Sequence, residues 1–220
     1  MTGHIAGRPP ISATTVRVAG LVPAGAARVA VDGVDGVGKT TFAAELAGAL
    51  RAGGREVVQV SADDFHQPRA VRHRRGRQSA EGFWLDSYDY PALRRTVLEP
   101  LGPGGDRRFR RGVHDLRTDA ALDLEWETAP DDAVLIVDGL FLHRDELRGC
   151  WEFTIFLDAP FEVTVPRMAA RDGSHPDPGH PSLARYVGGQ RLYFAACRPQ
   201  ERADVLIDHS DPGAPRIVRR

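Results

Sequence analysis

Residues 33–40 read GVDGVGKT and match the spacing G-x-x-x-x-G-K-[ST]. A short β-branched run, RVAVD at 28–32, precedes this stretch, and a helical pattern follows it until the glycine pair at 53–54. In a strand, glycine loop and helix of this order, backbone N–H groups point at phosphate oxygens. This feature constrains the fold most, because such a loop needs a strand before it and a helix N-terminus after it.

Lys39 is the only lysine among the 29 Lys and Arg residues of the chain. A compact ammonium on a slim side chain can reach the β- and γ-phosphates from the first helical turn, whereas arginine brings a wide planar fork. Gly36 and Gly38 let the backbone bend inward, and a side chain at either position is expected to fill the space of the phosphate. The loop therefore indicates binding of a nucleoside triphosphate.

Short apolar runs alternate with helical segments along the rest of the chain. Beyond the loop, strands are expected at 56–61, 133–138, 152–157 and 204–208, and helices at about 160–171 and 183–197. The strands are nearly continuous apolar runs, which is typical of a parallel sheet buried on both faces. The sequence predicts an α/β P-loop NTPase fold, with a mainly parallel five-stranded sheet and helices on both faces.

Residues 28–215 are expected to form one domain. Residues 1–27, rich in Gly, Pro and Ala, are expected to form a poorly ordered arm or a short helix. Between the second and third strands, 109–115 and 122–128 alternate in a way that predicts a β-hairpin. YVGGQRL at 186–192 is expected to be part of a helix in which the two glycines are accidental.

Composition excludes several classes of protein. No apolar run approaches the ~20 residues needed to span a bilayer, and the N-terminus lacks the basic region of a signal peptide, so a cytoplasmic location without membrane partners is expected. A net charge of −1 gives no general attraction to nucleic acid. The arginine clusters at 69–77 and 107–111 are expected to be solvated loops, although the first could contact a charged substrate. Cys150 and Cys197 lack metal-ligand spacing and are expected to be reduced thiols.

Carboxylates at the ends of two predicted strands suit phosphoryl transfer. Asp138 ends the strand at 133–138, and with the hydroxyl of Thr40 it is the expected protein ligand of Mg²⁺ bound to ATP. A kinase also needs a base at this edge of the sheet, where Asp63 and Asp64 follow the second strand. The residue types do not decide between these two. A GTPase is disfavoured, because no second lysine exists for a guanine-reading N-K-x-D motif.

Over about residues 30–210, the chain resembles the uridine kinase and phosphoribulokinase family of P-loop kinases. The resemblance rests on these segments and their order: GVDGVGKTT, SADDFH, SYDYP, VLIVDG, FLDAP with RMAARD, and ADVLID. The resemblance implies a transferase that uses ATP and Mg²⁺, with Lys39 in catalysis and Asp63 as the base. The residues it implies for binding ATP through the Walker A loop are Gly33, Asp35, Gly36, Val37, Gly38, Lys39, Thr40 and Thr41.

The same resemblance implies a substrate-binding insertion at about 66–127 and a helical lid at about 165–185. In the lid, Arg167 and Arg171 lie one turn apart, bind ATP and close over the moving phosphate, with Arg171 catalytic. In the insertion, Asp89 holds acceptor hydroxyls beside Tyr88. Uridine kinases read the base with a Tyr and a His in the hairpin, and here VHDLRTD has His114 and Asp115 at the nearest positions.

The acceptor is therefore expected to be a small-molecule alcohol, with uridine or cytidine as the leading candidates. Pantothenate, nicotinamide riboside or a sugar phosphate is the alternative, because the hairpin departs from that of uridine kinases. A non-catalytic nucleotide-binding regulator is a third hypothesis. The sequence leaves open the preference for ATP or GTP and whether the chain forms a homo-oligomer.

Overall fold

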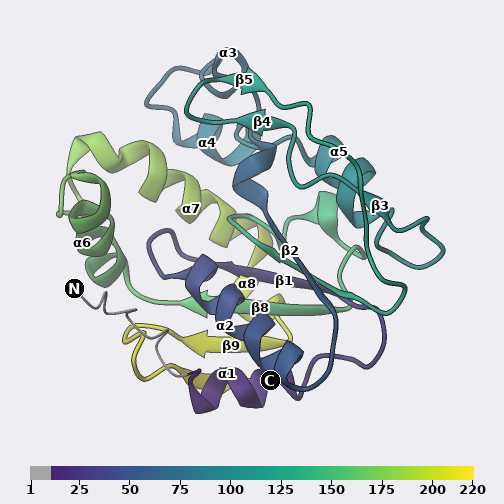
Figure 1. Cartoon of the computed structure of the whole chain (residues 1–220). Helices are drawn as coiled ribbons and strands as arrows, with labels where there is room; N and C mark the ends of the chain where they lie inside the picture. The colour runs from purple at the N-terminus through teal and green to yellow at the C-terminus, as the bar shows by residue number, and fades with distance from the viewer. Residues whose placement is uncertain (1–10) are drawn as a thin grey trace, which may run out of the picture.

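The computed structural model describes residues 11–220. Its centre is a six-stranded sheet in the order β10-β9-β8-β1-β7-β2 (Figure 1). The strands are β1 Arg28–Gly33, β2 Val57–Ser61, β7 Val134–Asp138, β8 Phe153–Asp158, β9 Val205–Asp208 and β10 Arg216–Arg219. All neighbours pair in parallel except β10 with β9. The predicted mainly parallel α/β sheet is confirmed.

The sheet has one strand more than the five predicted. β10 pairs antiparallel with β9 at the edge of the sheet, just beyond residue 215, where the domain was expected to end. Its sequence, RIVR, has two apolar residues between arginines, a signal too weak to predict a strand. The amide of Ser210 and the guanidinium of Arg216 both donate hydrogen bonds to the carboxylate of Asp208, and they lower its pKa to about 2.

Helices cover both faces of the sheet. The α-helices are α1 Ala13–Ala19, α2 Lys39–Ala52, α3 Arg69–Arg72, α4 Ala80–Asp86, α5 Tyr90–Leu93, α6 Phe161–Asp172, α7 Ala184–Cys197 and α8 Pro199–Arg202. Shorter turns are η1 Ala62–Phe65, the π-helical η2 Arg94–Leu98, η3 Asp145–Leu147 and η4 Pro181–Leu183. The chain crosses from β1 to β2 toward one edge and from β8 to β9 toward the other, so right-handed crossovers put α2 and α7 on opposite faces (Figure 1).

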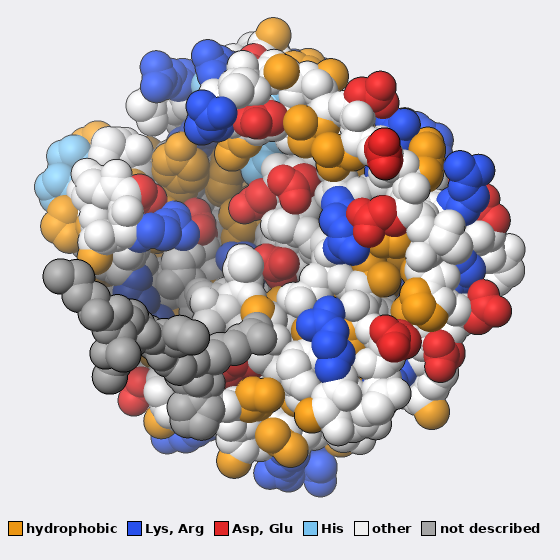
Figure 2. Space-filling model, in the orientation of Figure 1, with side chains coloured by type: hydrophobic (Ala, Val, Ile, Leu, Met, Phe, Trp, Pro, Cys, Tyr) orange, Lys and Arg blue, Asp and Glu red, His pale blue; other side chains and the backbone are white. Residues whose placement is uncertain are grey.

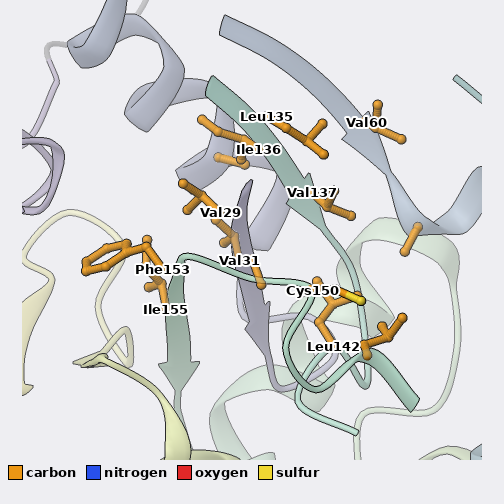
Figure 3. Packing of buried hydrophobic residues seen from close by; sticks show 14 of the residues in the cluster. Val29, Val31, Val60, Leu135, Ile136, Val137, Leu142, Cys150, Phe153 and Ile155 are labelled. Carbon is orange, nitrogen blue, oxygen red and sulfur yellow. The ribbon is translucent and has the colours of Figure 1, made fainter. Parts of the chain in front are cut away.

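The central strands form the core of the molecule. Every residue of β1 and of β7 is buried, as expected for strands that are covered on both faces. Figure 3 shows Val29 and Val31 of β1 beside Ile136 and Val137 of β7, with Ile155 of β8 next to them. This packing fixes the carboxyl ends of the strands, from which the glycine loop and the predicted carboxylates emerge.

The segment at about 66–127, predicted to be an insertion, contains α3, α4, α5 and two short antiparallel ladders. β3 Arg108–Phe109 pairs with β6 Glu127–Thr128, and β4 His114–Asp115 pairs with β5 Ala120–Ala121. The two ladders are nested around one turn. The predicted pairing of 109–115 with 122–128 thus takes the form of two short ladders rather than one continuous hairpin.

The predicted N-terminal arm is described only in part, because residues 1–10 lie outside the described residues. In the described part, Ser12 caps α1 by accepting a hydrogen bond from the amide of Thr15 at 3.0 Å. The hydroxyl of Thr15 donates to Glu45 of α2 at 3.2 Å, and α1 packs on α2. Residues 11–27 therefore include a short helix, one of the two predicted forms.

Two glycines of α7 lie against α4. A methyl group at Gly189 would lie 2.7 Å from Phe83 Cδ1 and 2.9 Å from the carbonyl oxygen of Ala80. A methyl group at Gly188 would lie 2.8 Å from the Cβ of Ala80. The expectation that these glycines are accidental is therefore wrong, because they allow the insertion helix α4 to approach α7 closely.

Candidate active site

The glycine loop leaves the carboxyl end of β1 and enters α2. Gly36 and Gly38 have φ angles of 77° and 100°, which favour glycine. A methyl group at Gly36 would also lie 2.6 Å from Met168 Cγ and 2.7 Å from the carbonyl oxygen of Thr164. We expected a phosphate to exclude a side chain at Gly36, but in the structure α6 occupies that space. Glycine here lets the loop pack against α6.

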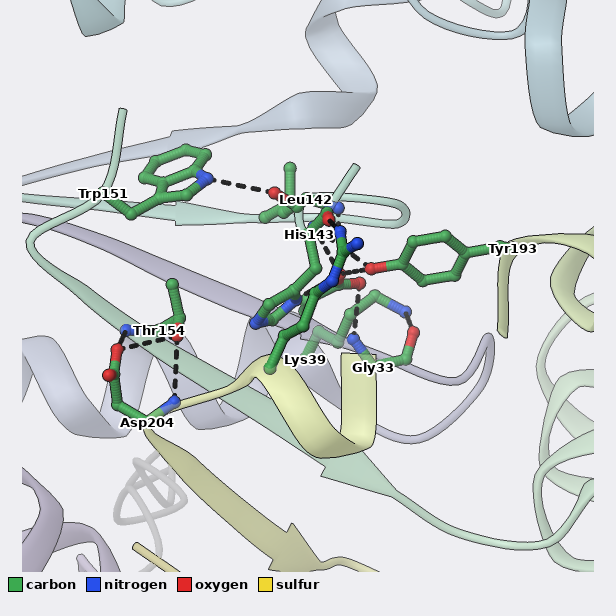
Figure 4. Close-up of polar contacts among 10 residues, drawn as sticks. Gly33, Lys39, Leu142, His143, Trp151, Thr154, Tyr193 and Asp204 are labelled. Carbon is green, nitrogen blue, oxygen red and sulfur yellow. Dashed lines mark hydrogen bonds and ion pairs between the residues drawn. The ribbon is translucent and has the colours of Figure 1, made fainter. Parts of the chain in front are cut away.

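The start of α2 offers hydrogen-bond donors. Among the residues that the structure describes, the backbone N–H groups of Lys39, Thr40 and Thr41 donate to no protein acceptor, as is usual in a first helical turn. The Lys39 ammonium folds back over the loop and donates to the carbonyl oxygen of Gly33 at 3.3 Å (Figure 4). It also donates to the carbonyl oxygen of Val34 at 3.0 Å. Unpaired amides, a helix N-terminus and an ammonium together suit an anion such as a phosphate chain.

The two predicted metal ligands lie side by side. The hydroxyl of Thr40 donates to Oδ2 of Asp138 at 2.7 Å. Burial raises the pKa of Asp138, while the hydrogen bond from Thr40 partly opposes that rise. Two hard oxygen ligands suit Mg²⁺, which usually keeps water and phosphate oxygens in the rest of its shell. The residues therefore fit a magnesium ion that arrives with a nucleotide.

Asp63 lies at the end of β2, in η1, with an exposed side chain. The hydroxyl of Tyr88 donates to its Oδ1 at 3.1 Å, while Oδ2 accepts no hydrogen bond from the described residues. His66 Nδ1 donates to the carbonyl oxygen of Asp63 at 2.7 Å, and its ring packs on Tyr88 with 4.4 Å between centroids. The carboxylate is thus oriented by one oxygen, and the other can receive a proton from a hydroxyl group.

Asp64 lies in an acidic environment. Burial, and then the charges of Asp63, Asp138 and Asp115, raise the pKa of its carboxyl. The carbonyl oxygen of Asp64 accepts a hydrogen bond from the amide of Val113 at 2.9 Å, which ties η1 to the insertion. Figure 2 shows acidic side chains gathered in a hollow of the molecule. Ser61 at the end of β2 pairs with Asp138 of β7, so the predicted base and the predicted metal ligand lie at the same edge of the sheet.

Two residues that were predicted to bind the phosphate-accepting substrate already make hydrogen bonds within the protein. Asp89 Oδ1 caps α5 by accepting the amide of Ala92 at 2.9 Å, so one carboxylate oxygen remains for a ligand. His114 is buried, and its Nε2 donates to Asp119 Oδ1 at 3.1 Å. The same oxygen accepts the amide of Arg69 at 2.8 Å. Asp119, in the turn between β4 and β5, therefore ties that ladder to α3, and His114 bonds to Asp119 within the same turn.

The structure does not bring the two predicted lid arginines together on one partner. Arg167 donates to the carbonyl oxygens of His209 and Ser210, which anchors α6 to the segment after β9. Arg171 is 64% exposed and pairs with Asp172 at 3.1 Å. A clamp on a phosphate would require Arg167 to leave these carbonyls, and this role stays a prediction for both residues.

Two buried residues that the sequence did not single out contact the glycine loop. Gln190 of α7 accepts the amide of Asp35 through Oε1 at 2.7 Å. His209 donates from Nδ1 to the carbonyl oxygen of Val37 at 2.8 Å, and burial lowers its pKa. For Gln190, the adjacent glycine pair inside a helix is a sequence signal of close packing. We find no comparable signal for His209.

A buried carboxylate supports the start of the loop. Asp32, 0% exposed, accepts hydrogen bonds from the amides of Gly33 at 2.7 Å and Leu142 at 2.9 Å. The amide and Nδ1 of His143 donate to it at 3.2 and 2.9 Å, and so does the hydroxyl of Tyr193 (Figure 4). This network joins β1, the segment after β7, and α7.

Replacing Asp32 with asparagine is expected to destabilise the fold. The NH₂ group of asparagine would face N–H or O–H donors at a position where a carboxylate oxygen accepts from them. We expect this to cost about 3 kcal/mol in the free energy of unfolding. In a chain of this size, that loss lowers the melting temperature by roughly 6–12 °C, which thermal denaturation measures. Tyr193→Phe removes a single donor and is expected to cost about 1 kcal/mol. An Asp32→Asn variant that melts at or above the Tyr193→Phe temperature would contradict this account of the network.

Part of the arginine-rich loop at 69–77 is anchored rather than free. Arg74 and Arg75 both pair with Asp86, whose side chain is 0% exposed, and the contact from Arg75 is 3.0 Å. Arg185 of α7 is buried and donates to the carbonyl oxygens of Ser79 at 3.2 Å and Arg72 at 3.1 Å. The loop is therefore packed between α4 and the start of α7.

Comparisons with known proteins agree with the fold. The family model "Phosphoribulokinase / Uridine kinase family" matches residues 29–180. No curated protein matches the sequence. No helix within residues 11–220 is long and apolar enough to cross a membrane.

Solved structures with a similar fold include three proteins. A protein described as a possible uridine kinase from Bacillus stearothermophilus has a TM-score of 0.69 and 22% identity, covering 88% of this chain and 97% of that one. One assigned as a fructose transport system kinase from Silicibacter sp. TM1040 has a TM-score of 0.66 and 23% identity, covering 84% of this chain and 96% of that one. A phosphoribulokinase from Rhodobacter spheroides has a TM-score of 0.57 and 17% identity, covering 83% of this chain and 70% of that one. At these identities, the similarity shows a shared fold.

Proposed function

The chain belongs to the phosphoribulokinase / uridine kinase family, and on that premise we propose that it transfers a phosphoryl group from ATP to a hydroxyl of a small molecule, with a nucleoside as the leading candidate. One observation carries the proposal. The hydrogen-bonded pair Thr40–Asp138 and the oriented carboxylate of Asp63 lie at one edge of the sheet, and both carboxylates act on the pKa of Asp64. A phosphate-binding loop and a base are thereby within reach of one substrate.

In the proposed reaction, the amides at the start of α2 and the Lys39 ammonium bind the β- and γ-phosphates of ATP. Binding requires Lys39 to exchange the carbonyl oxygens of Gly33 and Val34 for phosphate oxygens. Magnesium, held by Thr40 and Asp138, would neutralise charge on the phosphates when it is bound. The loop thereby fixes the γ-phosphorus relative to the edge of the sheet.

Asp63 then acts on the acceptor. Its unpaired Oδ2 takes the proton of the acceptor hydroxyl. The hydroxyl oxygen forms a bond to the γ-phosphorus while the bond from the γ-phosphorus to the bridging oxygen of the β-phosphate breaks, which releases ADP. Tyr88 keeps the carboxylate in place through Oδ1. Arg171, at the exposed end of α6, is proposed to reach the moving phosphate as the lid closes and excludes water.

A nucleoside is the leading acceptor, with uridine and cytidine first. The free carboxylate oxygen of Asp89 can accept from sugar hydroxyls while its other oxygen caps α5. A charged alcohol such as a sugar phosphate is the second candidate, because the arginine-rich segment at 69–77 still has exposed arginines, among them Arg69 and Arg77. In this structure His114 bonds to Asp119, so reading of a base by His114 has no support from its present contacts.

The release of ADP with defined acceptors tests the proposal. The enzyme is mixed with ATP or GTP and with uridine, cytidine, other nucleosides, pantothenate, nicotinamide riboside or sugar phosphates, and mass spectrometry identifies the phosphorylated product. We expect release that depends on the acceptor, with the highest kcat/KM for uridine or cytidine. A sugar phosphate as the best acceptor would favour the second candidate. Binding of ATP without transfer to any acceptor would instead indicate a regulator and overturn the kinase proposal.

A further inference from the structure

Three consecutive residues of the glycine loop are held by three different parts of the fold. The amide of Asp35 donates to Gln190 of α7, and Gly36 packs against α6. The carbonyl oxygen of Val37 accepts from His209, which follows β9. Two of these supports lie on helices of the predicted lid region, because α6 carries the predicted lid arginines and α7 begins where the predicted lid ends. The loop is therefore linked directly to the elements that carry the lid.

Of these three supports, Gln190 is the one that bonds to a loop amide through a side-chain acceptor. It is 2% exposed, and its Nε2 donates to the carbonyl oxygen of Tyr186 at 3.2 Å. That bond turns the amide group so that Oε1 faces the amide of Asp35 at 2.7 Å. The glycines before it seat α7 against α4. The side chain is thus fixed at both ends before any nucleotide arrives.

We propose that Gln190 is a positioning residue for nucleotide binding, which holds the peptide between Val34 and Asp35 so that the amides that follow are directed at the phosphates. The inference rests on the proposed function. It assigns no contact between Gln190 and ATP itself. Because Gln190 lies on the helix after the lid, the same hydrogen bond transmits a movement of α7 to the phosphate loop.

The residue type fits this role. Glutamine supplies a neutral acceptor for a backbone N–H next to the site of a polyanion, whereas glutamate would add a negative charge there. Methionine has a similar length and packs well, but its thioether is a weak acceptor. The two substitutions therefore separate the hydrogen bond from the charge.

The first test compares Gln190→Met with the wild-type protein. We expect the Kd for AMP-PNP with Mg²⁺, measured by calorimetry, and the KM for ATP to rise about tenfold, the size expected for one buried hydrogen bond. The KM for the acceptor and the kcat at saturating ATP should change less than twofold. Thr96→Val, which removes a buried hydrogen bond to Ala92 away from the loop, serves as the control and should leave both nucleotide constants unchanged.

The second test uses Gln190→Glu, which keeps an acceptor and covers the case in which the methionine variant does not fold. Its affinity for AMP-PNP should be weaker than that of the wild type, because the added charge repels the phosphates and is too buried for salt to screen. Wild-type affinity for AMP-PNP in Gln190→Met, or an equal rise in both KM values, would overturn the role of Gln190. If the wild-type protein itself does not bind AMP-PNP, the proposed function fails as well, so the two failures are distinguishable.

Discussion

Asp63→Asn is expected to lower kcat about a thousandfold, within the range usual for loss of a general base, while ATP binding remains near that of the wild type. An amide cannot take the proton of the acceptor hydroxyl, but it can still accept the hydrogen bond from Tyr88 that orients the side chain. The side chain is exposed and lies outside the glycine loop, so the fold and the phosphate contacts should persist. Steady-state ADP release gives kcat, and calorimetry with AMP-PNP gives the affinity.

Asp64→Asn is the matched control for this variant. Asp64 is the adjacent carboxylate, and burial and like charges raise its pKa. Removing its charge is expected to change kcat less than tenfold, because no described donor orients its carboxylate as Tyr88 orients that of Asp63. Near-normal kcat in Asp63→Asn together with a large loss in Asp64→Asn would assign the base to Asp64 instead.

Lys39→Arg is expected to lower kcat/KM for ATP roughly 100-fold, although the positive charge is kept. The ammonium lies close against the carbonyl oxygens of Gly33 and Val34, a space that suits a compact group better than a planar guanidinium. Arginine should therefore stand off from the β- and γ-phosphates. The kinetics of ADP release at varied ATP concentration measure this effect.

The exposed Arg51 near the end of α2 offers a control for the same chemical exchange. Arg51→Lys swaps the two residue types on the same helix, more than two turns from the loop, and should leave kcat/KM within twofold of the wild-type value. If Lys39→Arg also keeps wild-type kcat/KM, the geometric explanation for the single lysine is wrong.

The sequence predicted the parts of the fold that short-range patterns determine. Continuous apolar runs marked β1, β2, β7, β8 and β9, and the structure has strands there. The glycine spacing marked the junction of β1 and α2, and α6 and α7 lie where the helical patterns placed them. The approach of Thr40 to Asp138 also followed from the sequence, because adjacent parallel strands end at the same edge of a sheet.

Long-range contacts were harder to predict. Gln190 lies 155 positions from Asp35, and the periodicity of α7 does not show which side chain faces the loop. The network around Asp32 likewise depends on α7 and on the segment after β7 meeting the end of β1. β10 is a short edge strand whose pairing with β9 depends on the sheet rather than on its own composition. Such contacts arise from tertiary packing, for which a single sequence gives no direct signal.

A crystal structure of the protein with AMP-PNP and Mg²⁺ tests the central claim, that the start of α2 is a cradle for a triphosphate. We expect the β- and γ-phosphates at hydrogen-bond distance, about 2.7–3.2 Å, from the amides of residues 38–41. The Lys39 ammonium should have left the carbonyl oxygens of Gly33 and Val34 for the phosphates. A bound AMP-PNP whose phosphates lie away from these amides, with Lys39 still on the loop carbonyls, would contradict the account.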